Sequence, residues 1–304
     1  MGGEGLSRGA RKLKVRLEME ELLKRRSLTF YPGCIATSIY PGVTYSSIKV
    51  LEKLGFKVLS PEHVVCCGLP LEIAGMIGRE ELKMLTSYNM RRLIKHDVVV
   101  TPCNGCYRTF NVALKKSPSE NIECLHVAEV LWLLREKISE MVQDSLKGLN
   151  VVTHVGCHYA YAMHAKAIRG VDGEDLLEDI ALSLGANVLS YEEKATCCGA
   201  TAMKWPWVLE ALSPVSRLKV TSMVDADADL ILVMCTACQL MIDKTQYQMR
   251  DLGELDKVIP VLHVSQLVGL ALGFHPVEDV GLHLHLVPPK DISATSIKGL
   301  FKEA

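Results

Sequence analysis

Ten of the eleven cysteines in this 304-residue chain fall into two sets with the same order. Each set has one cysteine, then an adjacent pair, then a Cys-x-x-Cys pair, with gaps of 31 and 35 residues in one set and 39 and 36 in the other. The sets are Cys34, Cys66, Cys67, Cys103 and Cys106, and Cys157, Cys197, Cys198, Cys235 and Cys238. Five thiolates are one more than a tetrahedral zinc ion or an ordinary four-cysteine cluster needs. The pattern therefore indicates iron–sulfur chemistry of an uncommon kind.

Three other chemistries fit parts of this pattern. A zinc ion in one half would use the adjacent pair and the Cys-x-x-Cys pair, which leaves the fifth cysteine without a role. A thioredoxin-like dithiol at a Cys-x-x-Cys pair leaves the adjacent cysteines unexplained. A disulfide scaffold is typical of small secreted chains, and adjacent cysteines pair with each other only under strain. Metal-bound thiolates in a reducing, cytoplasmic setting fit best, with zinc in one half as the alternative.

Two histidines flank the first cysteine of the second set. His154 and His158 are candidates for protonating a leaving thiolate, because histidine titrates near neutral pH, although a core or shielding role would need the same residues. His126 and His263 recur at matching places in the two halves, and we expect them to be structural or to donate a hydrogen bond to sulfur. Cys124 lies outside both sets, and we expect it to be a small buried apolar residue.

The similarity between the halves extends beyond cysteine. Residues 54–60 (LGFKVLS) match residues 184–190 (LGANVLS), and each stretch precedes an adjacent cysteine pair that is followed by glycine. Residues 125–131 (LHVAEVL) likewise parallel residues 262–268 (LHVSQLV). An internal duplication that produced two similar lobes is the simplest explanation.

Strands alternate with helices in each half, a pattern that favours Rossmann-like α/β lobes with parallel sheets. In the first half we expect strands at 28–31, 56–59 and 98–100, helices at 42–54 and 71–95, and a strand–helix pair around 122–136. In the second half we expect strands near 150–155, 187–190, 229–234 and 258–263. The helix after Cys198 is expected to be irregular, because Pro206 and Pro214 interrupt it.

This layout explains the spacing of the cysteines, because every cysteine group follows a predicted strand. The carboxyl ends of parallel strands lie along one edge of a sheet, where ligands of open α/β folds bind. Three strand ends thus bring one, two and two thiolates to one place. The helices after the Cys-x-x-Cys pairs add backbone N–H groups and a positive dipole end, which favour anionic sulfur.

The chain is long enough for two domains, each with its own core. We expect a basic extension at 1–27, a first domain at 28–147, a second at 148–285 and a tail at 286–304. The extension carries a net charge of +4 and has no apolar signal region, while the net charge of the whole chain, −1, argues against a dedicated nucleic-acid binder. Polar residues interrupt the longest apolar stretch, 258–274, so no membrane span is expected.

The doubled cysteine pattern resembles the cysteine-rich CCG domain found in the B subunit of heterodisulfide reductase, over roughly residues 28 to 285. Further residues carry the resemblance: Tyr31-Pro-Gly-Cys34, Pro41-Gly42, Cys103-Asn-Gly-Cys-Tyr107, His154-Val-Gly-Cys-His158 and Pro260-Val-Leu-His263. The resemblance implies that each set of five cysteines holds one noncubane [4Fe–4S] cluster. It also implies that a disulfide substrate lies between the two clusters, each of which supplies one electron and captures one sulfur.

The resemblance further implies a complex with partner subunits. The chain has no ferredoxin cysteine run and no dinucleotide fingerprint, so electrons would come from a ferredoxin-like iron–sulfur subunit and a flavin-bearing subunit. Gly68-Leu-Pro70 and Ala200-Thr-Ala-Met203 differ from the methanogen branch of the family, which leaves the substrate open. The alternatives are a sulfur-oxidising complex that acts on lipoate-bound sulfur, and a CCG electron-transfer module of hydroxyacid oxidation.

Overall fold

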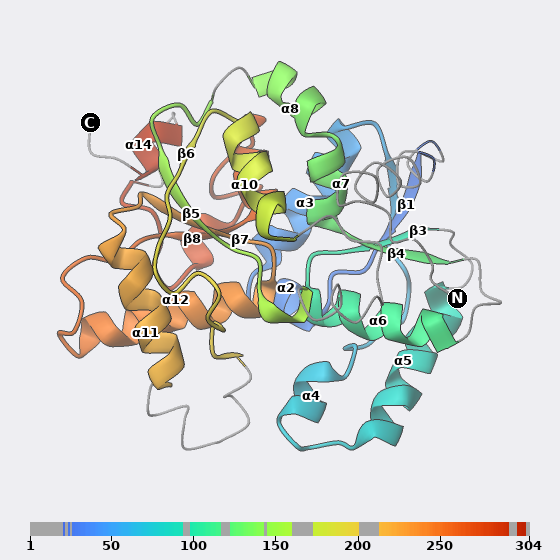
Figure 1. Ribbon diagram of the computed structural model, residues 1–304. Helices are drawn as coiled ribbons and strands as arrows, with labels where there is room; N and C mark the ends of the chain where they lie inside the picture. Colours follow the sequence, from blue (N-terminus) through green and yellow to red (C-terminus); the bar gives the residue numbers. More distant parts are fainter. Residues whose placement is uncertain are drawn as a thin grey trace, which may run out of the picture.

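The fold contains two four-stranded sheets in which every paired strand is parallel (Figure 1). The computed structural model describes residues 21, 24, 26–93, 98–116, 122–142, 145–159, 173–200, 213–291 and 297–301. The predicted fold class, two duplicated α/β lobes with parallel sheets, is therefore confirmed. We call residues 27–142 the first lobe and residues 150–301 the second lobe. The expected boundary between residues 147 and 148 falls in the turn between them.

The first sheet has the strand order β2-β1-β3-β4. Its strands are β1 (Ser27–Phe30), β2 (Lys57–Leu59), β3 (Val98–Thr101) and β4 (Glu123–His126). The central strand β3 is a run of β-branched residues that is buried throughout, as expected of a parallel strand covered on both faces. The strand predictions for this lobe agree with the structure to within a residue or two.

The second sheet repeats this order as β6-β5-β7-β8. Its strands are β5 (Asn150–His154), β6 (Asn187–Val188), β7 (Leu230–Val233) and β8 (Val261–His263). As in the first sheet, the third strand in sequence, β7, is fully buried and apolar. The two sheets thus share one topology, which is the structural counterpart of the sequence repeat.

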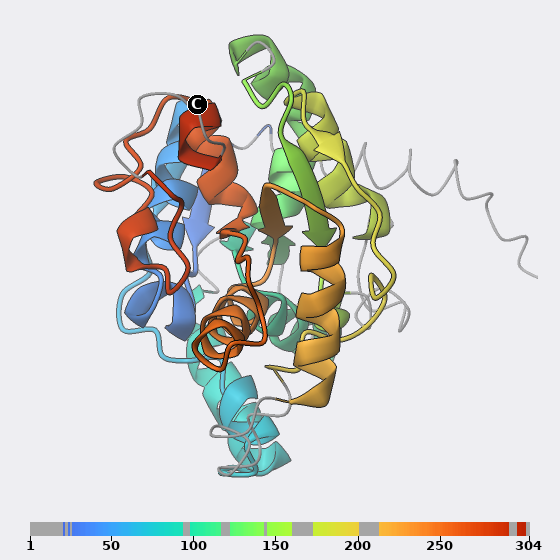
Figure 2. The ribbon, with the colours of Figure 1, turned by 90° about the vertical axis from the view of Figure 1, so that its left-hand side faces the viewer.

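The helices of the first lobe connect its strands. They are α2 (Cys34–Ser38), α3 (Pro41–Lys53), α4 (Leu69–Ile73), α5 (Arg79–Leu93), α6 (Asn104–Lys116), α7 (Val127–Leu133) and α8 (Arg135–Val142). The single helix expected at 71–95 is wrong, because residues 74–78 separate α4 from α5. Gly75 in this break adopts φ +72°, a left-handed conformation that ends a helix. Figures 1 and 2 show α4 and α5 projecting from the body of the molecule.

The second lobe contains a matching series of helices. They are α10 (Gly173–Ser183), α11 (Pro214–Asp225), α12 (Thr236–Asp251), α13 (Val264–Ala271), the short 3-10 helix η3 (Leu282–Leu284) and α14 (Ile297–Phe301). Pro214 is the first residue of α11, where its missing N–H costs nothing. The expected irregularity at Pro206 lies outside the described residues.

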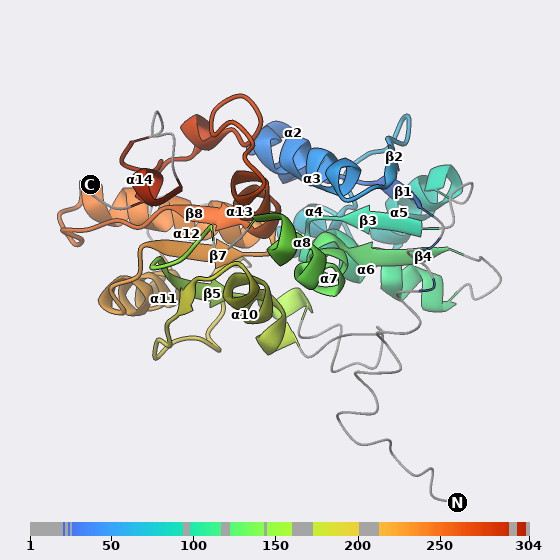
Figure 3. The same ribbon diagram turned by 90° about the horizontal axis from the view of Figure 1, so that it is seen from above.

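The two lobes share one core, not a separate core each as expected, because α7 and α13 pack across the contact between them. Helix α7 of the first lobe packs against α10 of the second, and α13 of the second packs against α3 of the first. Figure 3 shows α7 and α13 at the centre, between the two sheets. The main cluster of buried apolar residues is consequently continuous from Leu28 to Phe301. This packing fixes the two sheets relative to each other.

No helix among the described residues has the length and apolar character needed to cross a bilayer. Most of the basic extension at 1–27 lies outside the described residues, as does part of the tail at 286–304.

Candidate metal centre

Every cysteine of the two sets lies in the segment that follows the carboxyl end of a strand. In the first lobe, Cys34 opens α2 after β1, Cys66 and Cys67 lie in the loop after β2, and Cys103 and Cys106 begin α6 after β3. The second lobe repeats this arrangement: its single cysteine follows β5, its adjacent pair follows β6, and its Cys-x-x-Cys pair opens α12 after β7. The parallel topology therefore gathers the cysteines as the sequence predicted.

One cavity joins the two sets. It has a volume of about 220 Å³, and its lining includes nine of the ten cysteines, all except Cys66. Leu69, Pro70 and Ile73 form an apolar wall on the side of the first lobe, while Asn104 and His158 supply polar groups. The two sets of cysteines thus face a shared space rather than two separate sites.

The sulfur atoms within each set lie close together. The Sγ atoms of Cys34 and Cys66 are 3.5 Å apart, and those of the equivalent residues Cys157 and Cys197 are 3.8 Å apart. The Sγ atoms of Cys198 and Cys238 are separated by 3.3 Å. A further contact joins the two sets, because Cys103 in the first lobe hydrogen-bonds with Cys235 in the second.

Glycines let the backbone approach these sulfurs. Gly68 adopts φ +89° and donates its N–H to Cys66 Sγ at 3.5 Å, and Gly199 adopts φ +86° and donates to Cys197 Sγ at 3.4 Å. The sulfur contacts with Cys34 and Cys157, with help from these N–H groups, lower the pKa values of the Cys66 and Cys197 thiols respectively. Deprotonated sulfur is the form that binds metal.

A second pair of glycines, Gly33 and Gly156, precedes the first cysteine of each set. Gly33 has φ +75°, and a Cβ atom there would lie 2.9 Å from Cys106 Sγ. Gly156 has φ +89°, and a Cβ atom there would lie 3.0 Å from Cys238 Sγ. Any larger residue would therefore crowd a sulfur in the same set, in addition to its backbone strain.

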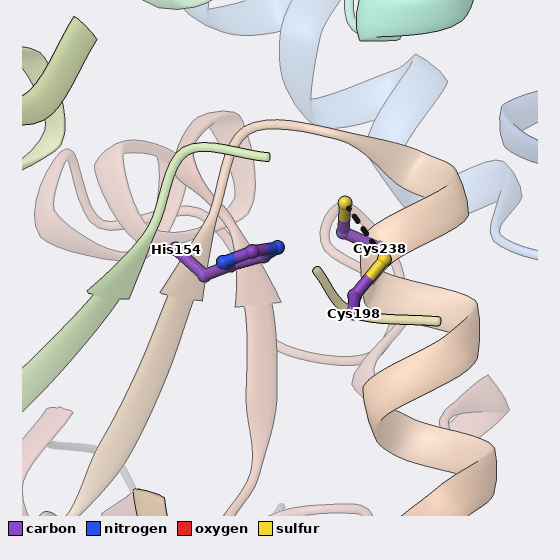
Figure 4. A group of neighbouring side chains, drawn as sticks. All are labelled: His154, Cys198 and Cys238. Atoms are coloured by element: carbon purple, nitrogen blue, oxygen red, sulfur yellow. Dashed lines mark hydrogen bonds between the residues drawn. The ribbon is translucent and has the colours of Figure 1, made fainter. Parts of the chain in front are cut away.

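His154 projects from the end of β5 toward Cys198 and Cys238, as Figure 4 shows. The ligand atoms of these three buried residues all lie within 4.8 Å of one another. Burial lowers the pKa of His154 to about 3, and its Nε2 atom has no hydrogen-bond partner in the described part of the chain. A neutral imidazole of this kind is suited to bind metal or to face a cluster, and less suited to donate a proton at neutral pH.

His158 occupies a different environment from His154, although both flank Cys157. It is half-buried and belongs to the lining of the cavity. Burial lowers its pKa, and the positive charge of Arg108 acts in the same direction. Of the two histidine candidates, only His158 lines the cavity.

The recurring histidines His126 and His263 are helix caps. The Nδ1 atom of His126 accepts a hydrogen bond from the N–H of Ala128 at 3.1 Å, and His263 accepts from Ser265 at 3.2 Å. His263 Nε2 also lies 3.0 Å from the carbonyl of Pro102, which ties the second lobe to the first. Both histidines thus have the structural role that was expected, as caps of α7 and α13. Cys124 is buried in β4, as expected.

Three polar residues near the cavity were not singled out from the sequence. Asn104 is fully buried between the sets and donates its Nδ2 N–H to the carbonyl of Val155, at 2.7 Å, in the other lobe. Lys219 is fully buried beside the second set, and Glu129 is fully buried beneath the first. Of the three, only Asn104 had a signal in the sequence, its position between two cysteines. The burial of Lys219 and Glu129 depends on tertiary packing and leaves no such pattern.

The donor set fits iron–sulfur clusters. Soft thiolate ligands favour iron–sulfur clusters, copper(I) or zinc over hard cations such as magnesium. Six of the ten cysteines are buried and four are half-buried, so that each set forms a sulfur-rich site shielded from bulk water. Each set also contains one cysteine more than a single zinc ion would use.

Comparison with known proteins places this arrangement in a family. The cysteine-rich domain family designated CCG matches residues 28–111 and again residues 151–243. A relative in Methanosarcina mazei, named as the B subunit of ferredoxin:CoB-CoM heterodisulfide reductase, is 28% identical over 86% of this chain and 93% of its own. The membrane anchor subunit of 8-methylmenaquinol:fumarate reductase from Wolinella succinogenes is 25% identical over 86% of this chain and 98% of its own.

One solved structure supports the fold. A hypothetical protein from Helicobacter pylori matches with a TM-score of 0.62 and 13% sequence identity. The match covers 86% of this chain and 52% of that protein, so this chain spans about half its length.

Proposed function

The chain belongs to the cysteine-rich CCG domain family, and from this premise we propose that it is the disulfide-handling iron–sulfur subunit of a heterodisulfide-reductase-like complex. The relatives named above are subunits of reductases, which supports an oxidoreductase-associated role with partner subunits. The observation that carries the proposal is the single cavity whose lining holds cysteines of both sets.

In this proposal each set of five cysteines holds one cluster of the noncubane [4Fe–4S] type. The first cluster is bound by Cys34, Cys66, Cys67, Cys103 and Cys106, and the second by Cys157, Cys197, Cys198, Cys235 and Cys238. When bound, the clusters supply electron transfer, one electron each. The contact between Cys103 and Cys235 brings the two sets together, so that one substrate meets both.

The proposed reaction takes two electrons and two protons to convert one disulfide into two thiols. The electrons come from partner subunits, one ferredoxin-like and one flavin-bearing. His158 is placed to pass a proton from solvent to a leaving sulfur, because it lines the cavity and is only half-buried. His154 is fully enclosed beside Cys198 and Cys238, so we assign it to supporting the second cluster. The same groups serve the reverse reaction in a sulfur-oxidising system.

The first experiment measures iron, sulfide and zinc in the anaerobically purified chain. We expect about eight irons per chain with matching sulfide, as two [4Fe–4S] clusters require. One or two zinc ions with little iron would instead identify a zinc-stabilised scaffold.

The second experiment measures turnover with reduced viologen as the electron donor. Coenzyme M–coenzyme B heterodisulfide and lipoyl-protein disulfides are compared, and we expect thiol release from one of them. A fully iron-loaded protein that cleaves neither substrate would refute disulfide handling.

An electron-transfer module is the second candidate function. The match to the anchor subunit of a fumarate reductase supports it, because the name of that relative refers to no disulfide. In this case the iron-loaded chain would pass electrons from reduced viologen to a second carrier at full rate while leaving disulfides intact. The turnover assay thus separates the two candidates.

A further inference from the structure

Lys219 on α11 is a fully buried lysine beside the second set of cysteines. Its Nζ donates hydrogen bonds to the carbonyls of Glu193 at 2.6 Å and Lys194 at 2.8 Å, in the loop that leads to Cys197. The described part of the chain places no carboxylate within ion-pair distance of this ammonium. The charge is therefore stabilised by two carbonyl dipoles, by the Tyr191 ring, whose centroid lies 4.8 Å from Nζ, and by the nearby sulfurs and the Glu193 carboxylate.

Burying an ammonium is costly unless other groups compensate for its lost hydration. Burial lowers the pKa of Lys219 to about 8, and the nearby Cys198, Cys238 and Cys197 oppose that shift. The two backbone carbonyls accept hydrogen bonds from Nζ, an arrangement that suits an ammonium group, which has donors and no acceptor. The sulfurs that stabilise it are the proposed ligands of the second cluster.

The first lobe has a neutral residue at the corresponding place. Asn89 on α5 donates its Nδ2 N–H to the carbonyl of Val65 at 3.0 Å and accepts the N–H of Val65 at 2.9 Å. This side chain holds the loop that leads to Cys66 just as Lys219 holds the loop that leads to Cys197. Asn89 and Lys219 thus both anchor the loop before an adjacent cysteine pair, but only the second lobe uses a basic residue for this.

The residues that precede the first cysteine of each set do not cancel this difference. His154 lies three residues before Cys157, and burial keeps its ring neutral. Tyr31 lies three residues before Cys34, and burial raises the pKa of its hydroxyl, which donates to the carbonyl of Val65. Lys219 is thus a fully buried lysine beside the second set, and neither Asn89 nor Tyr31 supplies a cation at the corresponding places in the first lobe.

We propose that Lys219 makes the cluster of the second lobe the more easily reduced of the two, so that an incoming electron settles there first. The proposal rests on the iron–sulfur clusters of the proposed function. Reduction adds a negative charge to a cluster, and a buried cation nearby stabilises that charge more than water-exposed groups do. Cluster potentials are known to depend on net charge and hydrogen bonding around the sulfurs.

The test is a redox titration of the full-length, iron-loaded chain followed by EPR. Wild-type protein is expected to show two reductive waves at different potentials. The Cys66→Ser variant, which loses the first cluster, should retain only the wave at higher potential. Lys219→Met should move that wave to lower potential and leave the other wave in place, whereas Lys219→Arg should preserve both.

Two controls make the result decisive. Lys194→Met removes a half-exposed ammonium in the same lobe, which pairs with Glu178, and should move neither wave. If Lys219→Met fails to hold iron, Lys219→Gln replaces it, because a neutral amide can still donate to the Glu193 carbonyl.

Three results would overturn the inference: an unmoved upper wave in the neutral variant, equal shifts for Arg and the neutral residue, or retention of the lower wave in Cys66→Ser. Each of these outcomes is read on iron-loaded protein without any disulfide. An iron-free wild type would instead refute the proposed function itself, so the two failures remain distinguishable.

Discussion

The two lobes place their sulfurs in the same way but surround them with different polar groups. In both lobes the residue after the Cys-x-x-Cys pair meets the third residue of the helix that follows the last strand. In the first lobe these residues are Tyr107 and Glu129, whose oxygens lie 2.6 Å apart. In the second they are Gln239 and Gln266, joined by a hydrogen bond of 2.9 Å. The positions of the cysteines were retained after duplication, whereas the polar residues that surround them came to differ in charge and in proton binding.

The difference extends to the next neighbour of each pair. Glu129 also accepts the hydroxyl of Tyr159, at 2.8 Å, which comes from the second lobe two residues after Cys157. Gln266 instead lies 3.0 Å from His285. The first lobe therefore buries an ionisable carboxyl between two phenols, and the second buries two amides and a neutral histidine. Substitutions at equivalent positions of the two lobes show which of these positions have the same role in both.

The largest effect is expected from the adjacent cysteines. Cys66→Ser should remove the first cluster and Cys197→Ser the second, because serine is a poor ligand for iron compared with thiolate. Iron content should fall by about half in each variant, and disulfide turnover should be abolished in both, because the proposed cleavage uses both clusters. Full turnover with normal iron content in either variant would remove the ligand assignment.

Crowding of the sulfurs is expected to give the next largest effect. Gly33→Ala and Gly156→Ala each place a methyl group about 3 Å from a sulfur of the same set. Both should lower iron content, and Gly156→Ala more so, because its Cβ would also lie 2.8 Å from Asn104 Nδ2.

Gly55→Ala is the matched control for these variants. Gly55 has φ +102°, with nothing within 4 Å of an added Cβ, so alanine there adds backbone strain of about 1–2 kcal/mol without touching a sulfur. Iron content as low in Gly55→Ala as in the other two variants would mean that strain, and not crowding, is responsible.

The strands and the clustering of the cysteines could be predicted, because both depend on short-range sequence patterns. Buried strands such as 98–101 are short apolar runs, and cysteines that follow parallel strands must meet at one edge of the sheet. The fold class and the gathering of the cysteines follow from these two facts. The break between α4 and α5 was missed, because the apolar periodicity continues across it and only Gly75 marks the end of α4.

The polar environment was not predictable, because it depends on contacts between segments far apart in sequence. Lys219 lies in a helix whose sequence is typical of a surface helix, with Arg217 two residues before it. Its burial follows from the packing of α11 over the loop that leads to Cys197. The packing of α7 and α13 against helices of the opposite lobe was likewise not predictable, since a sequence repeat describes each half alone and not the surface on which that half packs.

The middle residues of the Cys-x-x-Cys pairs should give a smaller effect. Asn104→Ala leaves the half-buried carbonyl of Val155 without this donor, which costs about 1 kcal/mol. It also removes Oδ1, a buried acceptor with no partner among the described residues and part of the cavity wall. If the proposed function holds, we expect iron to be retained and disulfide turnover to fall about tenfold, the equivalent of about 1.4 kcal/mol.

Thr236→Ala is the counterpart in the second lobe. Its hydroxyl hydrogen-bonds with Cys103 across the lobe contact, and it is absent from the cavity lining. Turnover in Thr236→Ala should stay within about twofold of wild type. Equal losses of turnover in Asn104→Ala and Thr236→Ala would contradict a role for Asn104 at the cavity, and the two lobe contacts would then be equivalent.

The smallest effect on turnover, but a clear effect on stability, is expected from Glu129→Gln, which gives the first lobe the residue type of the second. Burial raises the pKa of Glu129 from 4.5 to about 7, against hydrogen bonds from Tyr107, Tyr159 and the N–H of His126. Between these two pH values the folded chain holds a proton that the unfolded chain has released. The contribution of Glu129 to the stability of the wild type should therefore fall as pH rises from about 4.5 through 7, by up to about 3 kcal/mol.

Glutamine does not titrate, so the Glu129→Gln variant should lack this decrease of stability with pH. It should therefore be more stable than the wild type at pH 8. The buried histidines are unchanged, and their contribution, which is lost as pH falls below about 6.5, cancels in the comparison. Urea unfolding midpoints of the anaerobic protein at pH 5 and pH 8 measure the difference. Glu80→Gln, at an exposed carboxylate on α5, should leave the wild-type slope intact. Parallel slopes for wild type and Glu129→Gln would show that the carboxyl is ionised in the folded chain, and the lobes would then differ in shape rather than in proton binding.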